Sequence, residues 1–158
     1  MTETYSINEE EIARRWQKFS HVSPYKRELG LMPHAVHPEW CALKVEYQET
    51  LVGDPATQVL HGGVITALLD AAFGFAILVK LPEIRPMATL DLRIDYLKPA
   101  TPGRVVLGGA VCYKLTPELA FVRGCAYHES PDDPIAAAVG IYMFTEGRTV
   151  IKNEEVLR

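Results

Sequence analysis

The sequence predicts an α+β fold in which an antiparallel sheet covers one long apolar helix. From Val64 to Val79 the only polar side chains are Thr66 and Asp70, and no turn signal interrupts the run. A run of this length is typical of a buried helix rather than a strand. Several strand-like segments joined by short turns follow it, and strands connected in this way pair antiparallel. One helix followed by consecutive strands indicates the α+β class.

An additional helix is predicted at the N-terminus, as a lid or brace on the domain. Ser6 and Glu9 form a capping-box pattern that opens a helix from about residue 7 to residue 19. Its apolar positions follow helical spacing. Its charged side chains are expected to face water: Glu9, Glu10, Glu11, Arg14, Arg15 and Lys18. Pro24 then begins a short helical turn that ends at Gly30.

The strands are predicted from alternation and from turn residues. Pro33 and Pro38 restrict the stretch between them to a loop or an edge strand. Residues 42–50 alternate as a strand before the central helix. After that helix, Leu90, Leu92, Ile94 and Tyr96 form one face of the next strand. Three further strands are expected over residues 105–115, 120–128 and 135–145.

Length and composition indicate one globular domain. The 158 residues are 48% hydrophobic and 23% charged, as in ordinary globular proteins. We divide the chain into an N-terminal helical extension (1–22), the main domain (23–148) and a C-terminal tail (149–158). The net charge of −4 argues against a nucleic-acid partner.

Three features suggest a cytoplasmic location without a membrane. The first eleven residues are polar and acidic, unlike a signal peptide. The central apolar run is shorter than the roughly 20 residues that a spanning helix needs. Cys41, Cys112 and Cys125 are odd in number and contain no Cys-x-x-Cys pair, which favours free thiols in a reducing compartment.

The start of the central helix carries a motif with chemical potential. His61, Gly62 and Gly63 precede the apolar run directly. The first backbone N–H groups of a helix have no partner within it, and they attract negative charge. The interior of the same helix holds a carboxylate at Asp70, whose burial is costly unless it is hydrogen-bonded or functional. One segment therefore offers an oxyanion-type donor and an acid.

Small side chains accompany the carboxylate. Thr66, Asp70 and Gly74 are spaced by four residues, with Gly63 about one turn further back, so that they share one face. This face leaves room for a ligand or another part of the backbone.

These residues resemble the hotdog-fold acyl-CoA thioesterases of the phenylacetate-pathway (PaaI-like) type. The resemblance rests on His61-Gly62-Gly63, six further residues and Asp70, together with the segment 88–100 and its turn. It extends over about residues 24–144. It implies a hotdog fold, in which the sheet wraps around the central helix. It also implies hydrolysis of an acyl-CoA without a metal or redox cofactor, coenzyme A being part of the substrate.

The resemblance also implies roles for individual residues. Asp70 is expected to act as nucleophile or general base, and the Gly62 N–H to polarise the thioester carbonyl. His61 is a further candidate catalytic residue, although the matching histidine of the family more often orients the loop and the substrate than transfers a proton. Gly63 is expected to add a second dipole, and Thr89 a hydroxyl beside the acid.

One position departs from the family pattern. The family often has an asparagine six residues before the histidine, whereas this chain has Pro55, next to Asp54. Either Asp54 takes over through a shifted turn, or substrate and water are held differently. The remaining substrate contacts are expected from the same helix. They are Thr66 and, for an apolar acyl or aryl group, Phe73, Phe75 and Ile77.

Two other functions remain open. A hotdog dehydratase also acts on acyl thioesters, but no hydratase-type motif is present. A non-catalytic acyl-CoA sensor or binding protein stays open because of Pro55. A metal site is not expected, because His34 and His37 lack a Cys or carboxylate at ligand spacing.

The positions of the two catalytic groups predict an oligomer. Gly62 and Asp70 are eight residues apart, which corresponds to roughly 12 Å along a helix. Both cannot touch one carbonyl carbon from within a single straight helix. The resemblance implies that a two-fold axis brings them together from two subunits. We therefore expect a homodimer at minimum, with a dimer of dimers as the further option, and two sites at each dimer interface.

Overall fold

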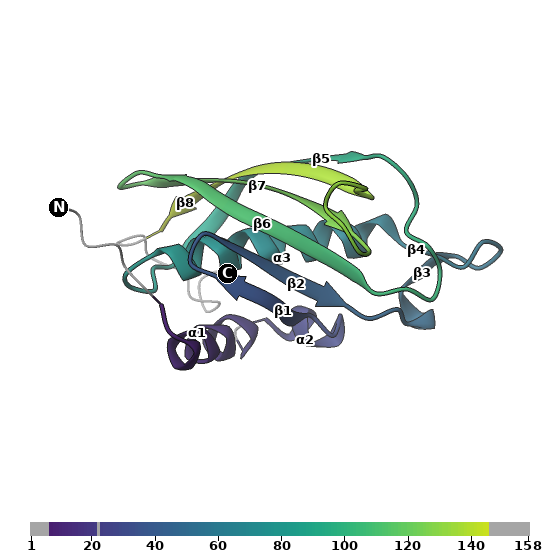
Figure 1. Ribbon diagram of the computed structural model, residues 1–158, viewed down its shortest axis with the longest axis horizontal. Coiled ribbons are helices and arrows are strands. Elements are labelled where there is room, and N and C mark those ends of the chain that lie inside the picture. Colours follow the sequence, from purple (N-terminus) through teal and green to yellow (C-terminus); the bar gives the residue numbers. More distant parts are fainter. Residues whose placement is uncertain (1–6, 22, 146–158) are drawn as a thin grey trace, which may run out of the picture.

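The computed structural model describes residues 7–21 and 23–145. It confirms the α+β hotdog arrangement, with a six-stranded antiparallel sheet in the order β1-β2-β6-β7-β8-β5. Figure 1 shows the sheet curving over the long helix α3 (Gly62–Lys80), with α1 (Glu9–His21) and α2 (Pro24–Glu28) at the bottom of the view. The strands are β1 (Met32–His37), β2 (Trp40–Val45), β5 (Met87–Tyr96), β6 (Val106–Leu115), β7 (Leu119–Tyr127) and β8 (Ala136–Phe144). The predicted tail, 149–158, lies outside the described residues.

Helix α3 is the core of the domain. At 19 residues it is long and apolar enough to cross a membrane, so the exclusion of a span on length was wrong. Burial explains its composition instead, because 72% of its most apolar window lies inside the protein. The sheet comes close to the helix at Phe73. A Cβ at Gly124 of β7 would lie 2.8 Å from the Phe73 ring, and one at Gly140 of β8 would lie 3.0 Å from it.

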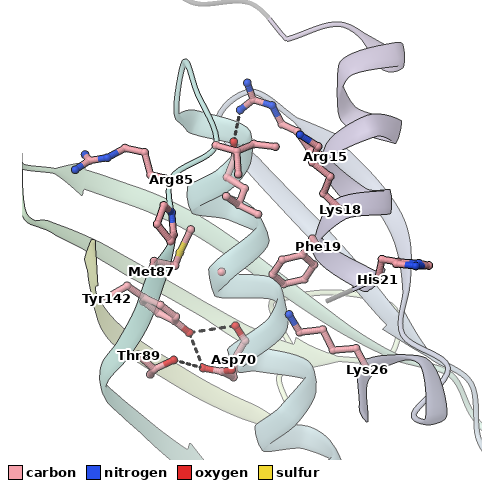
Figure 2. Close-up of a pocket in the computed structure, with 14 residues that line it drawn as sticks. Arg15, Lys18, Phe19, His21, Lys26, Asp70, Arg85, Met87, Thr89 and Tyr142 are labelled. Atoms are coloured by element: carbon pink, nitrogen blue, oxygen red, sulfur yellow. Dashed lines mark hydrogen bonds between the residues drawn. The ribbon is translucent and has the colours of Figure 1, made fainter. Parts of the chain in front are cut away.

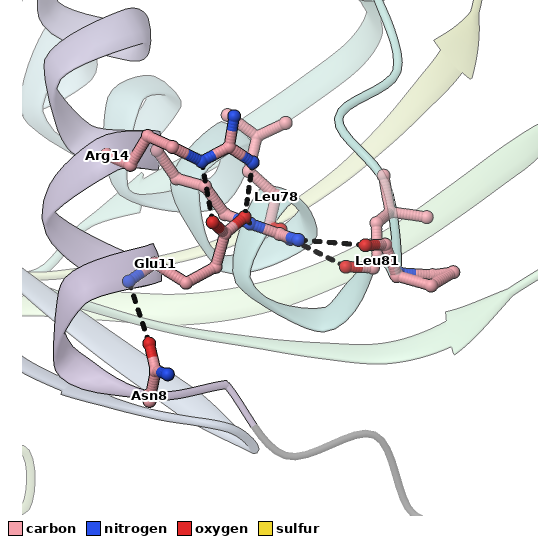
Figure 3. Close-up of polar contacts among 7 residues, drawn as sticks. Asn8, Glu11, Arg14, Leu78 and Leu81 are labelled. Carbon is pink, nitrogen blue, oxygen red and sulfur yellow. Dashed lines mark hydrogen bonds and ion pairs between the residues drawn. The ribbon is translucent and has the colours of Figure 1, made fainter.

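The N-terminal helix braces the C-terminal end of α3. Its first turn is capped by Asn8, whose side-chain oxygen accepts from the Glu11 N–H at 2.9 Å. The predicted cap, Ser6, lies outside the described residues. Arg15 was predicted to face water, and this was wrong: its side chain is only 1% exposed. Its guanidinium donates to the backbone carbonyls of Leu78 and Leu81, which end α3 without helical partners (Figure 3).

The chain before α3 is more divided than the sequence suggested. The stretch with Pro33 forms the edge strand β1, and a register shift beside Pro33 accommodates that residue. The single strand predicted over 42–50 is β2, which ends earlier, at Val45. A 3-10 turn (Glu49–Leu51) and a two-stranded hairpin then lead to α3. The hairpin consists of β3 (Val52–Asp54) and β4 (Val59–Leu60).

Strand β5 is the other edge of the sheet. It pairs with β8 on one side, and a register shift between Thr89 and Asp91 interrupts the ladder at Leu90. Leu90 was predicted to share one face with Leu92 and Ile94, but it is 56% exposed whereas those two are half-buried. The bulge reverses the alternation at Leu90, since one extra residue turns the following side chains to the other face.

Candidate active site

Asp70 lies at the middle of α3 and is held by two hydroxyl groups. Its Oδ1 accepts a hydrogen bond from Thr89 Oγ1 on β5 at 2.8 Å, and another from the Tyr142 hydroxyl on β8 at 2.8 Å (Figure 2). The Tyr142 hydroxyl also lies 3.1 Å from the Asp70 carbonyl oxygen. Within residues 7–21 and 23–145, Oδ2 takes part in no hydrogen bond. One carboxylate oxygen is therefore fixed while the other is open.

Tyr142 was not predicted as a site residue, although it contacts the acid directly. Burial, together with the charge of Asp70, raises the pKa of the Tyr142 hydroxyl well above its usual range. The group therefore stays protonated and keeps donating. It lies 72 positions from Asp70 along the chain. The only available signal was that a buried tyrosine usually needs a hydrogen-bond partner.

A cavity of about 650 Å³ opens beside Asp70. It lies where α1 and α2 approach α3, β5 and β8. Its walls are largely apolar, with several cationic side chains contributed by α1 and α2. The lining consists of Arg15, Lys18, Phe19, His21, Lys26, Asp70, Gly74, Leu78, Ile84, Arg85, Pro86, Met87, Thr89 and Tyr142.

The aromatic ring in this cavity differs from the expected ones. Phe73 is fully buried against the sheet, and Phe75 packs edge-on against Trp16 with ring centroids 5.2 Å apart. Neither lines the cavity, and nor does Ile77. Phe19 of α1 lines it instead, and Gly74 leaves the space into which the Phe19 ring fits. The space that the predicted row of small side chains leaves is therefore filled, at Gly74, by Phe19 of the N-terminal helix.

Lys26 of α2 contributes a charge to the same cavity. Its Nζ lies 3.3 Å from the centroid of the Phe19 ring, a cation–π geometry. Partial burial lowers the pKa of the Lys26 ammonium, and the charge of Asp70 works in the opposite direction. This residue was not predicted, because β1, β2 and the β3–β4 hairpin separate α2 from α3 along the chain.

The start of α3 forms a second region. His61 is the N-cap, and its Nδ1 accepts from the Gly63 N–H at 2.9 Å. Gly63 is therefore engaged by the cap and is not placed as a second free dipole. Gly62 is exposed, and no hydrogen bond of the described residues uses its N–H. The structure leaves the Gly62 donor open and gives His61 a capping contact.

Thr66 belongs to this region rather than to the surroundings of Asp70. Its hydroxyl lies 2.7 Å from the Tyr96 hydroxyl, and Tyr96 donates to the Gly62 carbonyl at 2.8 Å. Gly62 and Tyr96 line a separate cavity of about 350 Å³ that also reaches Lys98. The two predicted groups Gly62 and Asp70 therefore lie in different cavities of one chain.

Asp54 closes its own turn. Its carboxylate accepts from the Ala56 N–H at 3.0 Å and from Thr57 Oγ1 at 2.7 Å. These bonds, led by that from Thr57, lower the pKa of Asp54. The carboxylate that was expected to replace the missing asparagine is thus occupied within its loop. In the described part of the chain, no three His, Cys, Asp or Glu side chains are grouped as metal ligands.

Comparisons with known proteins identify relatives of this chain. The thioesterase superfamily profile matches residues 57–135. The medium/long-chain acyl-CoA thioesterase YigI of Escherichia coli is 33% identical over 96 residues, which cover 52% of this chain and 62% of YigI. A putative esterase of Halobacterium salinarum is 38% identical over 61 residues, covering 37% and 40%. The chain therefore spans less than two thirds of the length of these curated relatives.

Solved structures extend the similarity over most of the chain. A Pseudomonas aeruginosa protein is 39% identical, with a TM-score of 0.76, over 84% of this chain and 98% of its own. A variant of the phenylacetic acid degradation protein PaaI from Thermus thermophilus is 26% identical, with a TM-score of 0.66, over 77% and 99%. Escherichia coli PaaI, at 14% identity and a TM-score of 0.73 over 84% and 92%, shares the fold.

Proposed function

The chain belongs to the thioesterase superfamily, and on this premise we propose that it hydrolyses an apolar acyl- or aryl-CoA to the free acid and coenzyme A. The observation that carries the proposal is the carboxylate of Asp70. Thr89 and Tyr142 hold its Oδ1, while its Oδ2 is open beside a largely apolar cavity. An acid oriented in this way suits attack on a thioester whose acyl group fills the cavity.

The proposed chemistry balances by two routes. As general base, Asp70 takes a proton from water; the water oxygen bonds to the carbonyl carbon, the C–S bond breaks, and the thiolate takes up the proton. As nucleophile, Asp70 bonds to the carbonyl carbon and expels the thiolate, and water then hydrolyses the acyl-enzyme. In both routes the carbonyl oxygen gains negative charge, which the open Gly62 N–H would stabilise.

The separation of Gly62 from Asp70 supports a homodimeric site. The free edge of β5 carries Thr89, the partner of Asp70. The same strand exposes large apolar side chains, with Leu90 at 56% and Tyr96 at 51%, and Leu97 directly after it at 57%. Such an edge is a template for pairing with a second strand. A second copy paired there would bring its own helix start toward this Asp70.

Subunit mixing tests the shared site. Asp70→Asn and Gly62→Pro chains, each inactive alone, are unfolded together in equal amounts and refolded, so that about half of the dimers are mixed. Each mixed dimer holds one site with both defects and one with neither, and about a quarter of wild-type activity should return. If mixed dimers are present and nothing is recovered, each site is built from one chain.

Release of free thiol from a panel of acyl-CoA thioesters tests the activity itself. Catalytic release by the wild-type chain is expected for apolar acyl or aryl groups. Two results would favour the alternatives. Saturable binding of acyl-CoA without thiol release would indicate a sensor. Interconversion of enoyl- and hydroxyacyl-CoA without thiol release would indicate a dehydratase.

A further inference from the structure

The cavity beside Asp70 extends along one face of α3. Its wall on this helix is formed by Asp70, Gly74 and Leu78, which recur every four residues and lie in one row. The eight residues from Asp70 to Leu78 correspond to roughly 12 Å. Figure 2 shows Asp70 near one end of the cavity and Arg15 near the other, with α1 alongside. The cavity is therefore a channel that begins at the acid.

The end of the channel opposite Asp70 is closed by a fixed side chain. Arg15 is buried, and its guanidinium donates to the carbonyl oxygens of Leu78 and Leu81 and, at 2.9 Å, to that of Pro82. Glu11 holds the same guanidinium at 2.6 Å. Because each of these bonds joins α1 to α3 or fixes the guanidinium, the end wall cannot move without undocking the N-terminal helix.

Phe19 sets the width of the channel between its two ends. A Cβ built at Gly74 would lie 3.4 Å from the ring of Phe19, so the ring reaches the helix surface there. The ring is held by the Lys26 ammonium on one side and by Phe75, with centroids 5.5 Å apart. It is therefore a rigid constriction contributed by α1.

We propose that α1 is a length gauge for the acyl chain, with Phe19 and Gly74 as the specificity-determining residues. This inference rests on the proposed thioesterase function. The acyl chain runs from Asp70 past the Phe19 ring, on the side of Pro86 and Met87, and ends at Arg15. An extended hydrocarbon chain with C–C bonds of about 1.5 Å advances ~1.25 Å per carbon. Roughly 12 Å of channel then holds about ten carbons, which makes a medium-length saturated acyl group the preferred substrate.

The walls favour an unsubstituted chain. Leu78, Ile84, Pro86 and Met87 present apolar surface along the channel. The buried cation Arg15 already has its carbonyl and carboxylate partners. Of the other lining cations, Lys18 is exposed to water, Lys26 lies over the Phe19 ring, and Arg85 donates to the Pro117 carbonyl. A terminal carboxylate between the apolar walls would therefore leave water without a new charge partner, which is unfavourable.

Two opposite substitutions and one matched control test the gauge. Phe19→Ala should open a side space before the Arg15 wall into which a longer chain can turn, and should raise kcat/KM for palmitoyl-CoA relative to decanoyl-CoA by on the order of 10-fold. Gly74→Ala places a methyl group under Phe19 and should lower kcat/KM for decanoyl-CoA relative to butyryl-CoA by on the order of 10-fold. Alanine is also the better helix former, so unfolding is not expected to cause this loss. Ile12→Ala removes an apolar side chain seven residues before Phe19, on the same helix face but outside the cavity lining, and should leave both ratios unchanged.

Each outcome separates the gauge from the proposed activity. If no thioester is hydrolysed by the wild-type chain, the proposed function fails. If hydrolysis occurs but neither Phe19→Ala nor Gly74→Ala shifts the ratios, the gauge is overturned and the function stands. Equal shifts with Ile12→Ala would overturn it as well, because loosened packing of α1 would then be the cause. A wild-type preference for adipoyl-CoA over hexanoyl-CoA would overturn the apolar channel.

Discussion

The start and the middle of α3 differ in what they provide. The helix start is exposed and offers a backbone donor, with Gly62 open at the N–H and His61 capping the next residue. The middle of the helix is enclosed and offers an acid, with Asp70 beside a largely apolar cavity. Among the residues that the structure describes, no carboxylate lines the first region and no open backbone donor of α3 lies at the second. Neither region alone is a complete thioesterase site.

This division explains why the free edge of β5 matters. Both regions contact β5, through Tyr96 at the helix start and through Thr89 at the acid. A second copy paired antiparallel along that edge would place the start of its β5 beside the end of the other. The donor of one chain would then approach the acid of the other. The separation of the donor at the start of α3 from the acid at its middle is thus a reason for two chains to form a dimer. The following substitutions probe each of these two regions.

The largest expected effect is at the acid. Asp70→Asn is nearly isosteric and can still accept from Thr89 and Tyr142, but it can neither attack nor take a proton. We expect kcat to fall by on the order of 10³-fold or more. Thiol release measures the rate, and an unchanged thermal midpoint and acyl-CoA affinity are the controls. Wild-type turnover in this variant would remove Asp70 from the mechanism.

The next effect is at the donor. Gly62→Pro removes the open N–H and should lower kcat by about 10²–10³-fold. Proline suits this position because Gly62 is the first residue of α3. His61 before it already has φ −59 and ψ 134, which a following proline requires.

Gly62→Ala is the matched control for this substitution. It keeps the N–H, and its Cβ would lie 3.6 Å from the Tyr96 hydroxyl, an ordinary contact. We expect it to lose much less activity than Gly62→Pro. Equal losses in both variants would show that the shape of the site, rather than the N–H, is what position 62 contributes.

The surroundings of the helix start and of Asp70 also differ in how far they could be predicted from the sequence. His61, Gly62 and Asp70 are recognisable because one helix carries them and their spacing is local. Tyr142 and Lys26 were not predictable, because sequence gives neither the register of β8 nor the docking of α2. Predictions from periodicity were also wrong where the regular geometry of a strand is interrupted. The bulge at Leu90 reversed the alternation of β5, for example.

Arg15 shows the same limit in a helix. Its position in a charged segment indicated solvent, whereas the open carbonyls at the end of α3 are what bury it. Nothing in the sequence of α1 identifies the helix end on which it docks. The fold class was thus predictable from local patterns, whereas the packing of α1 over the cavity was not.

The docking of α1 on the C-terminal end of α3 should depend strongly on Arg15. Arg15→Met leaves the carbonyls of Leu78, Leu81 and Pro82 without this donor, and we expect a loss of about 3 kcal/mol in the free energy of unfolding. Urea denaturation measures it. Arg14→Met is the matched control, because Arg14 also binds Glu11, at 2.6 Å, but is 51% exposed. That loss should stay below about 1 kcal/mol. Similar losses in both variants would contradict the brace.

The smallest expected effect is a pH dependence of the same brace. Hydrogen bonds from Arg14 and Arg15 lower the pKa of Glu11 from 4.5 to about 2. A depressed folded-state pKa means that the unfolded chain binds the proton more readily. The stabilising contribution of Glu11 is therefore complete above about 4.5 and disappears as the pH falls toward about 2. The variant Glu11→Gln tests this pH dependence. It should have a slightly lower urea midpoint than wild type at neutral pH. The difference between the two midpoints should disappear across that acidic interval, because the wild-type side chain then becomes neutral as well. A gap that stays constant through the interval would mean that the charge of Glu11 does not hold α1 on the C-terminal end of α3.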